Sequence, residues 1–81
     1  MSDDKPVLKI ARKGVAYDRF YLHGVDNEPR KRRLEVFTEQ ALPVAQTVKV
    51  WVEMGSIRLS GRVMLFRDEV DEKRYSGVAE F

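Results

Sequence analysis

Four consecutive cations, Arg30–Arg33, form the densest charged stretch of the sequence. The planar guanidinium of arginine binds phosphate or carboxylate through two parallel hydrogen bonds. The run therefore predicts a phosphate-bearing ligand, held by Arg30, Arg32 and Arg33. An equally weighted alternative is a solvated junction between a loop and a strand, whose charge is balanced by neighbouring carboxylates.

A second group of residues with binding chemistry lies between residues 47 and 66. Apolar and polar side chains alternate there on both sides of Gly55-Ser56, which predicts an antiparallel β-hairpin with one buried face. A two-residue turn at this point places Trp51 diagonal to both Arg58 and Arg62. At that spacing the guanidinium groups are within reach of cation–π contacts with the indole ring.

The outer face of this hairpin has two interpretations. A tryptophan between arginines binds nucleotides and single-stranded nucleic acids, because the ring stacks on a base while the cations pair with phosphate. The register also sets Lys49 opposite Arg62, where like charges repel unless an anion lies between them. The slightly favoured alternative is that Trp51 is covered by the N-terminal strands or by a second subunit. That interaction surface would also use the aromatic residues of a strand near the N-terminus, Tyr17, Phe20 and Tyr21.

The sequence offers little for catalysis or metal binding. His23 is the single histidine, it lies beside Gly24 in a predicted loop, and no serine stands in a nucleophile motif. The acidic stretch 68–72 lacks the ligand order and the glycine of a calcium-binding loop. We expect no enzymatic activity, no catalytic residue, no metal and no cofactor.

Short strands are the elements that must position these residues. We expect strands at Pro6–Lys13, Val15–Leu22, Leu34–Thr38, the two arms of the hairpin and Tyr75–Phe81. We expect loops at His23–Pro29, Glu39–Gln46 and Arg67–Arg74, with at most one short helical turn because Pro43 prevents a longer helix. Six short strands at this spacing predict a small antiparallel β-barrel over residues 6–81, preceded by a flexible tail over residues 1–5.

Size and charge limit the function classes. A chain of 81 residues forms one domain with a modest core. A net charge of +2 makes nucleic acid a less favoured partner than a nucleotide or a protein. The sequence has no cysteine, and it shows neither a signal-peptide pattern nor an apolar run long enough for a membrane span. We expect a cytoplasmic location and no membrane contact.

The C-terminal half resembles the second half of a PilZ domain. The family features match at three places in this sequence: Leu42-Pro43-Val44, Gly61-Arg62-Val63 and the closing strand 75–81. The resemblance implies a six-stranded antiparallel barrel that binds cyclic diguanylate and relays its level to a partner protein. The family binds this ligand through an RxxxR motif and a D/N-x-S-x-x-G motif. The first is absent before residue 26, and the second lacks its serine and glycine at Asp26–Lys31.

Three hypotheses follow. The first is a non-enzymatic module that binds an anionic nucleotide, with cyclic diguanylate as the ligand that the resemblance implies. Its arginines would be Arg30, Arg32 and Arg33, with Arg58 and Arg62 on the hairpin. The second is a protein-interaction module, including a homodimer, and the third is a nucleic-acid-binding barrel that uses the same arginines with Trp51.

Overall fold

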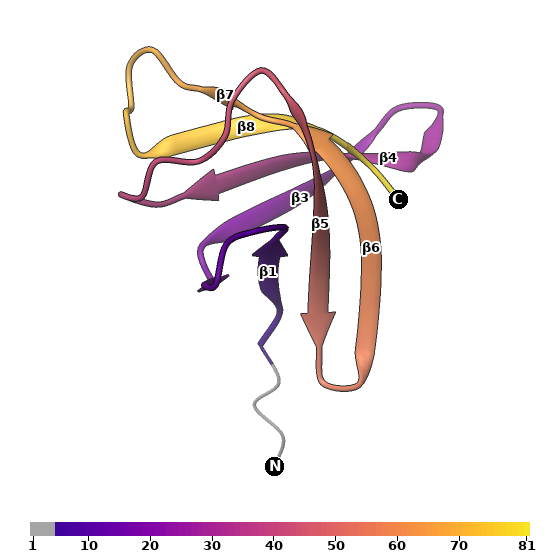
Figure 1. The fold of residues 1–81 in the computed structure, drawn as a ribbon. Helices are drawn as coiled ribbons and strands as arrows, with labels where there is room; N and C mark the ends of the chain where they lie inside the picture. Colours follow the sequence, from indigo (N-terminus) through magenta and orange to yellow (C-terminus); the bar gives the residue numbers. More distant parts are fainter. Residues whose placement is uncertain (1–4) are drawn as a thin grey trace.

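A computed structural model describes residues 5–81, and these form one antiparallel β-sheet without a helix (Figure 1). The sheet has eight strands. In chain order they are β1 Val7–Ile10, β2 Ala16–Tyr17, β3 Phe20–Val25, β4 Glu28–Phe37, β5 Thr47–Met54, β6 Ile57–Met64, β7 Phe66–Arg67 and β8 Arg74–Glu80. The predicted all-β class is confirmed. The flexible tail predicted for residues 1–5 lies outside the described residues, except for the exposed Lys5.

The sheet is strongly curved but open. Its strand order is β2-β1-β5-β6-β8-β4-β3, and β7 pairs with β8. The strands β3, β4 and β8 cross the direction of β5 and β6 (Figure 1). The expectation of a closed six-stranded barrel is therefore corrected to an open sheet of eight strands. Closure would need a ladder between the edge strands β2 and β3, but β2 has only two residues and both pair with β1.

The hairpin of β5 and β6 has the predicted turn and the predicted register. Met54 pairs with Ile57 across the turn, and the pairing continues without a shift to Thr47 and Met64. Gly55 has a φ of 60°, which is a left-handed conformation that glycine adopts at low cost. The period of two in the sequence is the physical origin of this regular ladder.

The prediction of a loop at His23–Pro29 is wrong. The strand β3 continues to Val25, β4 begins at Glu28, and only Asp26-Asn27 remain as a turn. Asn27 has a φ of 62°, a conformation that asparagine tolerates better than most residues. The pairing shifts after Gly24, so that Pro29 falls in an irregular segment where its missing N–H is not needed.

Other boundaries also differ from the prediction: the first strand ends at Ile10 and not at Lys13, and the short β7 was not predicted. The strand expected at Val15–Leu22 is divided into β2 and β3 by Asp18 and Arg19, which belong to neither strand. The strand expected at Leu34–Thr38 is the second half of the longer β4, so the basic run lies inside a strand and not at a junction. The described residues contain no helix that is long and apolar enough to span a membrane.

The core lies on the concave side of the sheet and is made of side chains from most of its strands. Leu8, Leu34, Val36, Val50 and Leu65 have no exposed surface. Further buried residues are Ile10, Tyr17, Leu42, Val63, Tyr75 and Ala79. Leu42 comes from the loop between β4 and β5, and its N–H donates a hydrogen bond of 3.3 Å to the Tyr75 hydroxyl.

The apolar face of the hairpin is buried only near its base. Val50 and Val63 are at most 1% exposed, whereas Met54, Ile57 and Leu59 near the turn are 43%, 65% and 47% exposed. The reason is position: the tip of the hairpin extends past the strands that cross it (Figure 1). The expectation that the whole alternating face is buried is therefore corrected for the tip.

Candidate anion-binding face

The outer side of β1, β5 and β6 carries the single tryptophan among several cations, and we call it the tryptophan face. Directly paired residues of neighbouring strands point to the same side of a sheet, as do residues two apart in one strand. The register places Lys9, Trp51 and Ser60 in one row across the three strands, and Lys49 and Arg62 in the next row. The residues of this side that the name covers are Lys9, Lys49, Trp51, Glu53, Arg58, Ser60 and Arg62.

Trp51 is partly buried and contacts two cations. The guanidinium carbon of Arg58 lies 5.1 Å from the ring centroid, and the Lys49 ammonium nitrogen lies 5.5 Å from it. Both distances fall within the range of cation–π attraction, which extends to about 6 Å. The expected contact to Arg58 is present, but Lys49 takes the second place that the sequence assigned to Arg62. Lys49 has this position because it stands two residues before Trp51 on the same strand.

The carboxylate of Glu53 neutralises one end of the tryptophan face. Its Oε1 lies 3.0 Å from Nζ of Lys9, and its Oε2 lies 3.8 Å from Nε of Arg58. At the other end, Lys49 and Arg62 are direct cross-strand partners and both are exposed. Within residues 5–81 neither of them has an ion-pair partner within 4.0 Å. The uncompensated positive charge of the face is therefore at Lys49 and Arg62.

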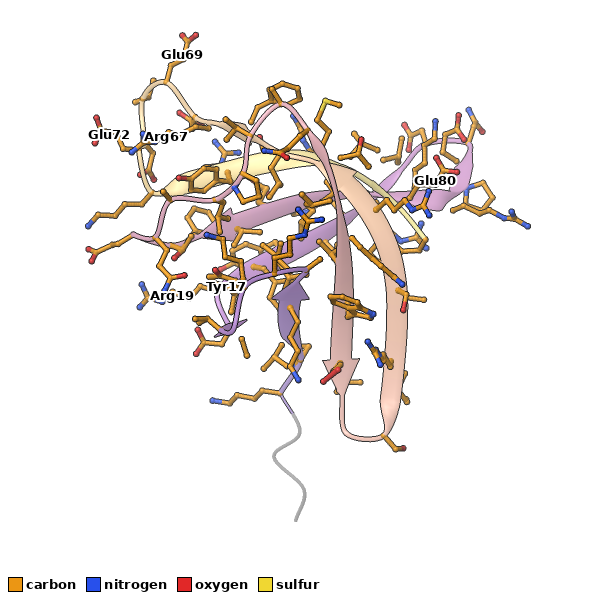
Figure 2. All side chains as sticks on the ribbon, in the orientation of Figure 1. Tyr17, Arg19, Arg67, Glu69, Glu72 and Glu80 are labelled. Atoms are coloured by element: carbon orange, nitrogen blue, oxygen red, sulfur yellow. The ribbon has the colours of Figure 1, made fainter. Side chains whose placement is uncertain are left out.

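A surface pocket of about 250 Å³ opens at this uncompensated end. It is lined by Lys49, Ser60, Gly61, Arg62, Glu80 and Phe81. Glu80, at the end of β8, is the cross-strand partner of Arg62 and reduces the positive charge without forming an ion pair with it (Figure 2). The pocket thus combines two cations, one carboxylate and a hydroxyl, which suits a small anion, and the ring of Phe81 that lines it packs against the core.

The basic run does not converge on one surface. In the ladder between β4 and β8, Arg32 is on the side of the buried Leu34, whereas Lys31 and Arg33 are on the opposite side. Arg30 precedes this ladder and is exposed. Nη1 of Arg32 donates to the backbone carbonyls of residues 29 and 31 at 2.8 and 2.7 Å. The structure therefore brings Arg58 and Arg62 to the face of Trp51. Arg32 lies on the other side of the sheet, and Arg33 lies on the outer side but on β4, two strands away from β6 and opposite Val78.

The three aromatic residues predicted for an interaction surface have three different environments. Tyr17 is 5% exposed and donates a hydrogen bond of 2.8 Å from its hydroxyl to Oε1 of Gln40, so it belongs to the core (Figure 2). Phe20 packs against the core as a partly buried residue. Tyr21 is 59% exposed and makes an edge contact with Phe37, with ring centroids 5.9 Å apart. They do not form one surface.

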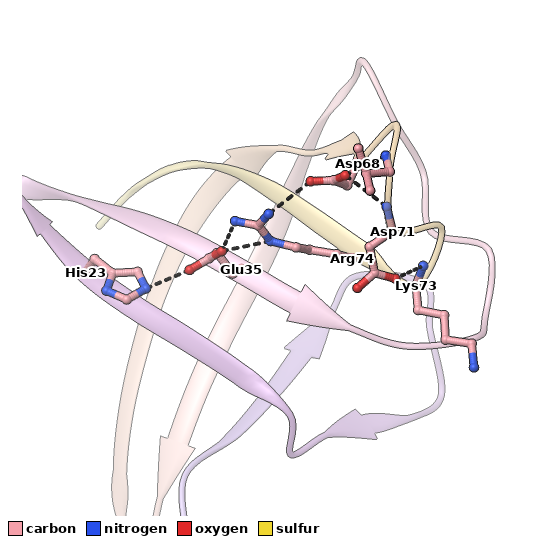
Figure 3. A network of polar contacts seen from close by, with 7 residues as sticks. His23, Glu35, Asp68, Asp71, Lys73 and Arg74 are labelled. Atoms are coloured by element: carbon pink, nitrogen blue, oxygen red, sulfur yellow. Dashed lines mark hydrogen bonds and ion pairs between the residues drawn. The ribbon is translucent and has the colours of Figure 1, made fainter.

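A polar network that the sequence did not predict links β3, β4 and β8 (Figure 3). Nε2 of His23 lies 2.7 Å from Oε2 of Glu35, and Nε of Arg74 donates to Oε1 of Glu35 at 2.9 Å. Nη1 of Arg74 donates to Oδ2 of Asp68 at 2.9 Å, so one guanidinium bridges two carboxylates. The hydrogen bonds from Arg74, followed by that from His23, lower the pKa of Glu35.

This network has a structural role. The backbone N–H groups of Asp71 and Val70 donate to Asp68, which lowers the pKa of that carboxyl and fixes the loop between β7 and β8. Other charged side chains of this loop, including Glu69 and Glu72, project outward (Figure 2). In a catalytic triad, a carboxylate orients a histidine whose other ring nitrogen contacts a nucleophile. Here Glu35 lies between His23 and Arg74 and binds both of them, which is a different arrangement. The arrangement holds three strands and a loop together.

Sequence reasoning found the part of the tryptophan face that lies on the hairpin and missed the part that lies on β1. The first strand was predicted at Pro6–Lys13, but no local signal pairs Lys9 with Trp51. That pairing joins residues far apart in the chain.

Comparison of the chain with known proteins finds no matching family model, no similar curated protein and no similar solved structure.

Proposed function

We propose that this protein is a non-enzymatic, PilZ-like binding module that holds a phosphate-bearing nucleotide on its tryptophan face. One observation carries the proposal: Lys49 and Arg62 face each other beside Trp51 without an ion-pair partner in the described chain. Two exposed like charges at this spacing are stabilised by an anion between them. Phosphate is the natural candidate, because the guanidinium of Arg62 can bind it in a bidentate manner.

The neighbouring residues suit the rest of a nucleotide. The indole ring of Trp51 and the guanidinium of Arg58 are planar groups next to the cation pair, and planar cations and aromatic rings stack on bases. The hydroxyl of Ser60, directly opposite Trp51, supplies a hydrogen-bond donor and acceptor. In this proposal Arg30, Arg32 and Arg33 do not hold the ligand, since their side chains diverge.

The size and chemistry of the face favour a nucleotide over a long nucleic acid. Cyclic diguanylate is the ligand that the PilZ resemblance implies, and its two phosphates and two bases match a face that alternates cations with planar groups. A nucleic-acid groove requires a continuous track of cations along the backbone. Here the uncompensated cations are Lys49 and Arg62, and Glu53 occupies the other end of the face.

The cytoplasmic location remains a prediction from the cysteine-free sequence.

Calorimetric titration with cyclic diguanylate tests this proposal. The wild type should release heat with a saturable isotherm. The Lys49→Gln/Arg62→Gln double variant should bind at least about a hundredfold more weakly, since each of the two lost charge-assisted contacts contributes about 1.5–3 kcal/mol. The Arg32→Ala/Arg33→Ala double variant is the matched control, with the same loss of two charges, and should bind like the wild type.

Two results would overturn the proposal. If Arg32→Ala/Arg33→Ala loses binding and Lys49→Gln/Arg62→Gln retains it, the basic run on β4 is the ligand site. If neither the wild type nor the variants bind cyclic diguanylate, GMP or a short oligonucleotide, the tryptophan face has no nucleotide-binding function. Binding of the oligonucleotide alone, with a steep loss of affinity in added salt, would identify a nucleic-acid-binding protein instead.

A further inference from the structure

The outer edge of β6 between Ile57 and Ser60 has no neighbouring strand in the part of the chain that the structure describes. At Gly61 the carbonyl of Glu80 and the ring of Phe81 already lie close. The strand β5 covers the other edge of β6 over its whole length, but the ladder with β8 begins only at Arg62, opposite Glu80. An unpaired edge presents backbone N–H and C=O groups to which a further strand can bind. The hairpin tip that carries this edge extends past the crossing strands (Figure 1).

Within residues 5–81, two other edges belong to the strands at the two ends of the sheet, β2 and β3. The edge strand β2 has only two residues, and the edge strand β3 ends in a register shift between Gly24 and Val25. Proteins protect edges with prolines, bulges or inward-pointing charges. The segment from Ile57 to Ser60 carries one edge charge, Arg58, but it has no proline, no bulge and no inward-pointing charge. Its ladder with β5 is continuous and its inward side chains, Ile57 and Leu59, are apolar.

We propose that this edge pairs with the same edge of a second copy of the chain, antiparallel and with Leu59 opposite the partner's Leu59. The residues that flank a two-residue turn form a hydrogen-bonded pair, and such pairs alternate along the ladder. Ile57 and Leu59 therefore direct their backbone groups toward β5, while Arg58 and Ser60 direct theirs toward the unpaired edge. A second copy presents the same two residues, which restricts the possible registers.

Charge selects one of these registers. A pairing centred on Arg58 would set two arginines directly opposite each other, which is destabilising. A pairing centred on Ser60 would require the edge of Arg62, which already pairs with Glu80. The pairing centred on Leu59 sets Arg58 opposite the partner's Ser60, so that their backbone groups can form hydrogen bonds without like charges directly opposite.

The same register joins exposed apolar side chains. Leu59 and Ile57 are 47% and 65% exposed in the single chain, and in the pair they form one strip across the two-fold axis. Removing this surface from water is favourable by about 25 cal/mol per Å² of apolar area. The ladder is short, so the association is weak and depends on concentration. The proposed dimer is independent of the proposed nucleotide site, because that site uses the outer face of the strands and the dimer uses the edge of β6.

A disulfide trap tests the register. The chain has no cysteine, so Leu59→Cys introduces the single thiol of the protein. Opposite residues of a non-hydrogen-bonded pair have Cα atoms about 4.5 Å apart, within the disulfide range of about 4.4–6.8 Å. Under mild oxidation Leu59→Cys should form cross-linked dimers faster than Ile57→Cys, which is more exposed but lies opposite the partner's Gly61. Random collision predicts the reverse order, and equal or faster cross-linking of Ile57→Cys would overturn the proposal.

Sedimentation of reduced protein supplies a second readout. The mean mass of the wild type should rise toward a dimer with concentration. Leu59→Glu and Leu59→Lys should each sediment as folded monomers, because like charges would meet at the axis, and an equimolar mixture of the two should associate again. Leu59 is half exposed, so both variants should keep the circular dichroism spectrum of the wild type. A wild type that stays monomeric at all concentrations, or a mixture that does not associate, contradicts the pairing.

Discussion

Lys49 and Arg62 are direct cross-strand partners on the outer face of the β5–β6 hairpin, so that two cations oppose each other beside Trp51. Like charges in this position cost about 0.2–1 kcal/mol in the free protein. A pair of cations that costs stability in the free protein has no structural benefit of its own, but it can bind an anion. The pair therefore indicates a binding role and not a structural one. The two roles predict different effects for the same substitutions.

The substitution Lys49→Gln should weaken nucleotide binding while leaving stability almost unchanged. It relieves the repulsion with Arg62 and loses a cation–π contact with Trp51, each about 0.5–1 kcal/mol and opposite in sign. We expect urea denaturation to give a free energy of unfolding within about 0.5 kcal/mol of the wild type. A loss of more than about 2 kcal/mol would indicate a structural role for Lys49 and contradict this account.

Glu35 should make stability depend on pH in the acid range. Its pKa is lowered in the folded protein, chiefly by Arg74, so its contribution is complete above the ordinary carboxyl pKa and is lost as the pH falls. Glu35→Gln should therefore be about 1 kcal/mol less stable than the wild type near neutral pH. The difference should shrink below about pH 4.3. Chemical denaturation at several pH values measures this difference.

Glu69→Gln is the control for this experiment. Glu69 is exposed on the loop between β7 and β8 and forms no ion pair with the described residues. Its substitution should leave both the stability and its pH dependence unchanged. A constant difference between wild type and Glu35→Gln from neutral to acid pH would show that the charge of Glu35 does not stabilise the network.

Gly77→Ala should destabilise the protein, whereas Gly24→Ala should not. A Cβ atom at Gly77 would overlap the carbonyl group of Met64, where the end of β6 lies close to β8. A Cβ at Gly24 would meet nothing within 4 Å. We expect Gly77→Ala to cost about 1–3 kcal/mol, which is the usual cost of overpacking. Thermal unfolding of the two variants checks this, and equal melting temperatures would contradict the close approach of these segments.

Tyr75→Phe should cost more stability than Tyr17→Phe. The Tyr75 hydroxyl accepts the backbone N–H of Leu42 in a buried position, and its removal leaves that N–H without a partner, at about 1–3 kcal/mol. The Tyr17 hydroxyl bonds to Gln40, an exposed residue that water can satisfy instead. Urea denaturation of the two variants should therefore give unequal losses, and the reverse order would contradict the buried bond to Leu42.

Local patterns determined which features of the fold were predictable. The alternation on both sides of Gly55-Ser56 fixes one register, so the pairing of Trp51 with Ser60 followed from the sequence alone. The stretch at His23–Pro29 carries loop residues, yet it forms a hairpin with a bulge, because β3 and β4 pair along most of their lengths. Propensity failed there because tertiary pairing overrides it.

The candidate site was also predictable only where its residues meet through local pairing. Trp51 and Arg58 meet through the hairpin register, which is local. The separation of Arg32 from Arg33 depends on their being inside a strand, whereas the sequence predicted a strand that begins only at Leu34 and placed both arginines at the junction before it. The network of Glu35 with Arg74 joins residues 39 positions apart and had no local signal.

The most direct test of the nucleotide site is the indole N–H resonance of Trp51, the single tryptophan, in NMR spectra recorded during titration with cyclic diguanylate. The proposed site predicts a saturable shift of this resonance in the wild type and in Arg32→Ala/Arg33→Ala, with the same affinity that calorimetry gives. It predicts little or no shift in Lys49→Gln/Arg62→Gln at the same ligand concentrations. An indole resonance that stays in place while the ligand binds, or that moves equally in Lys49→Gln/Arg62→Gln, would contradict binding on the tryptophan face.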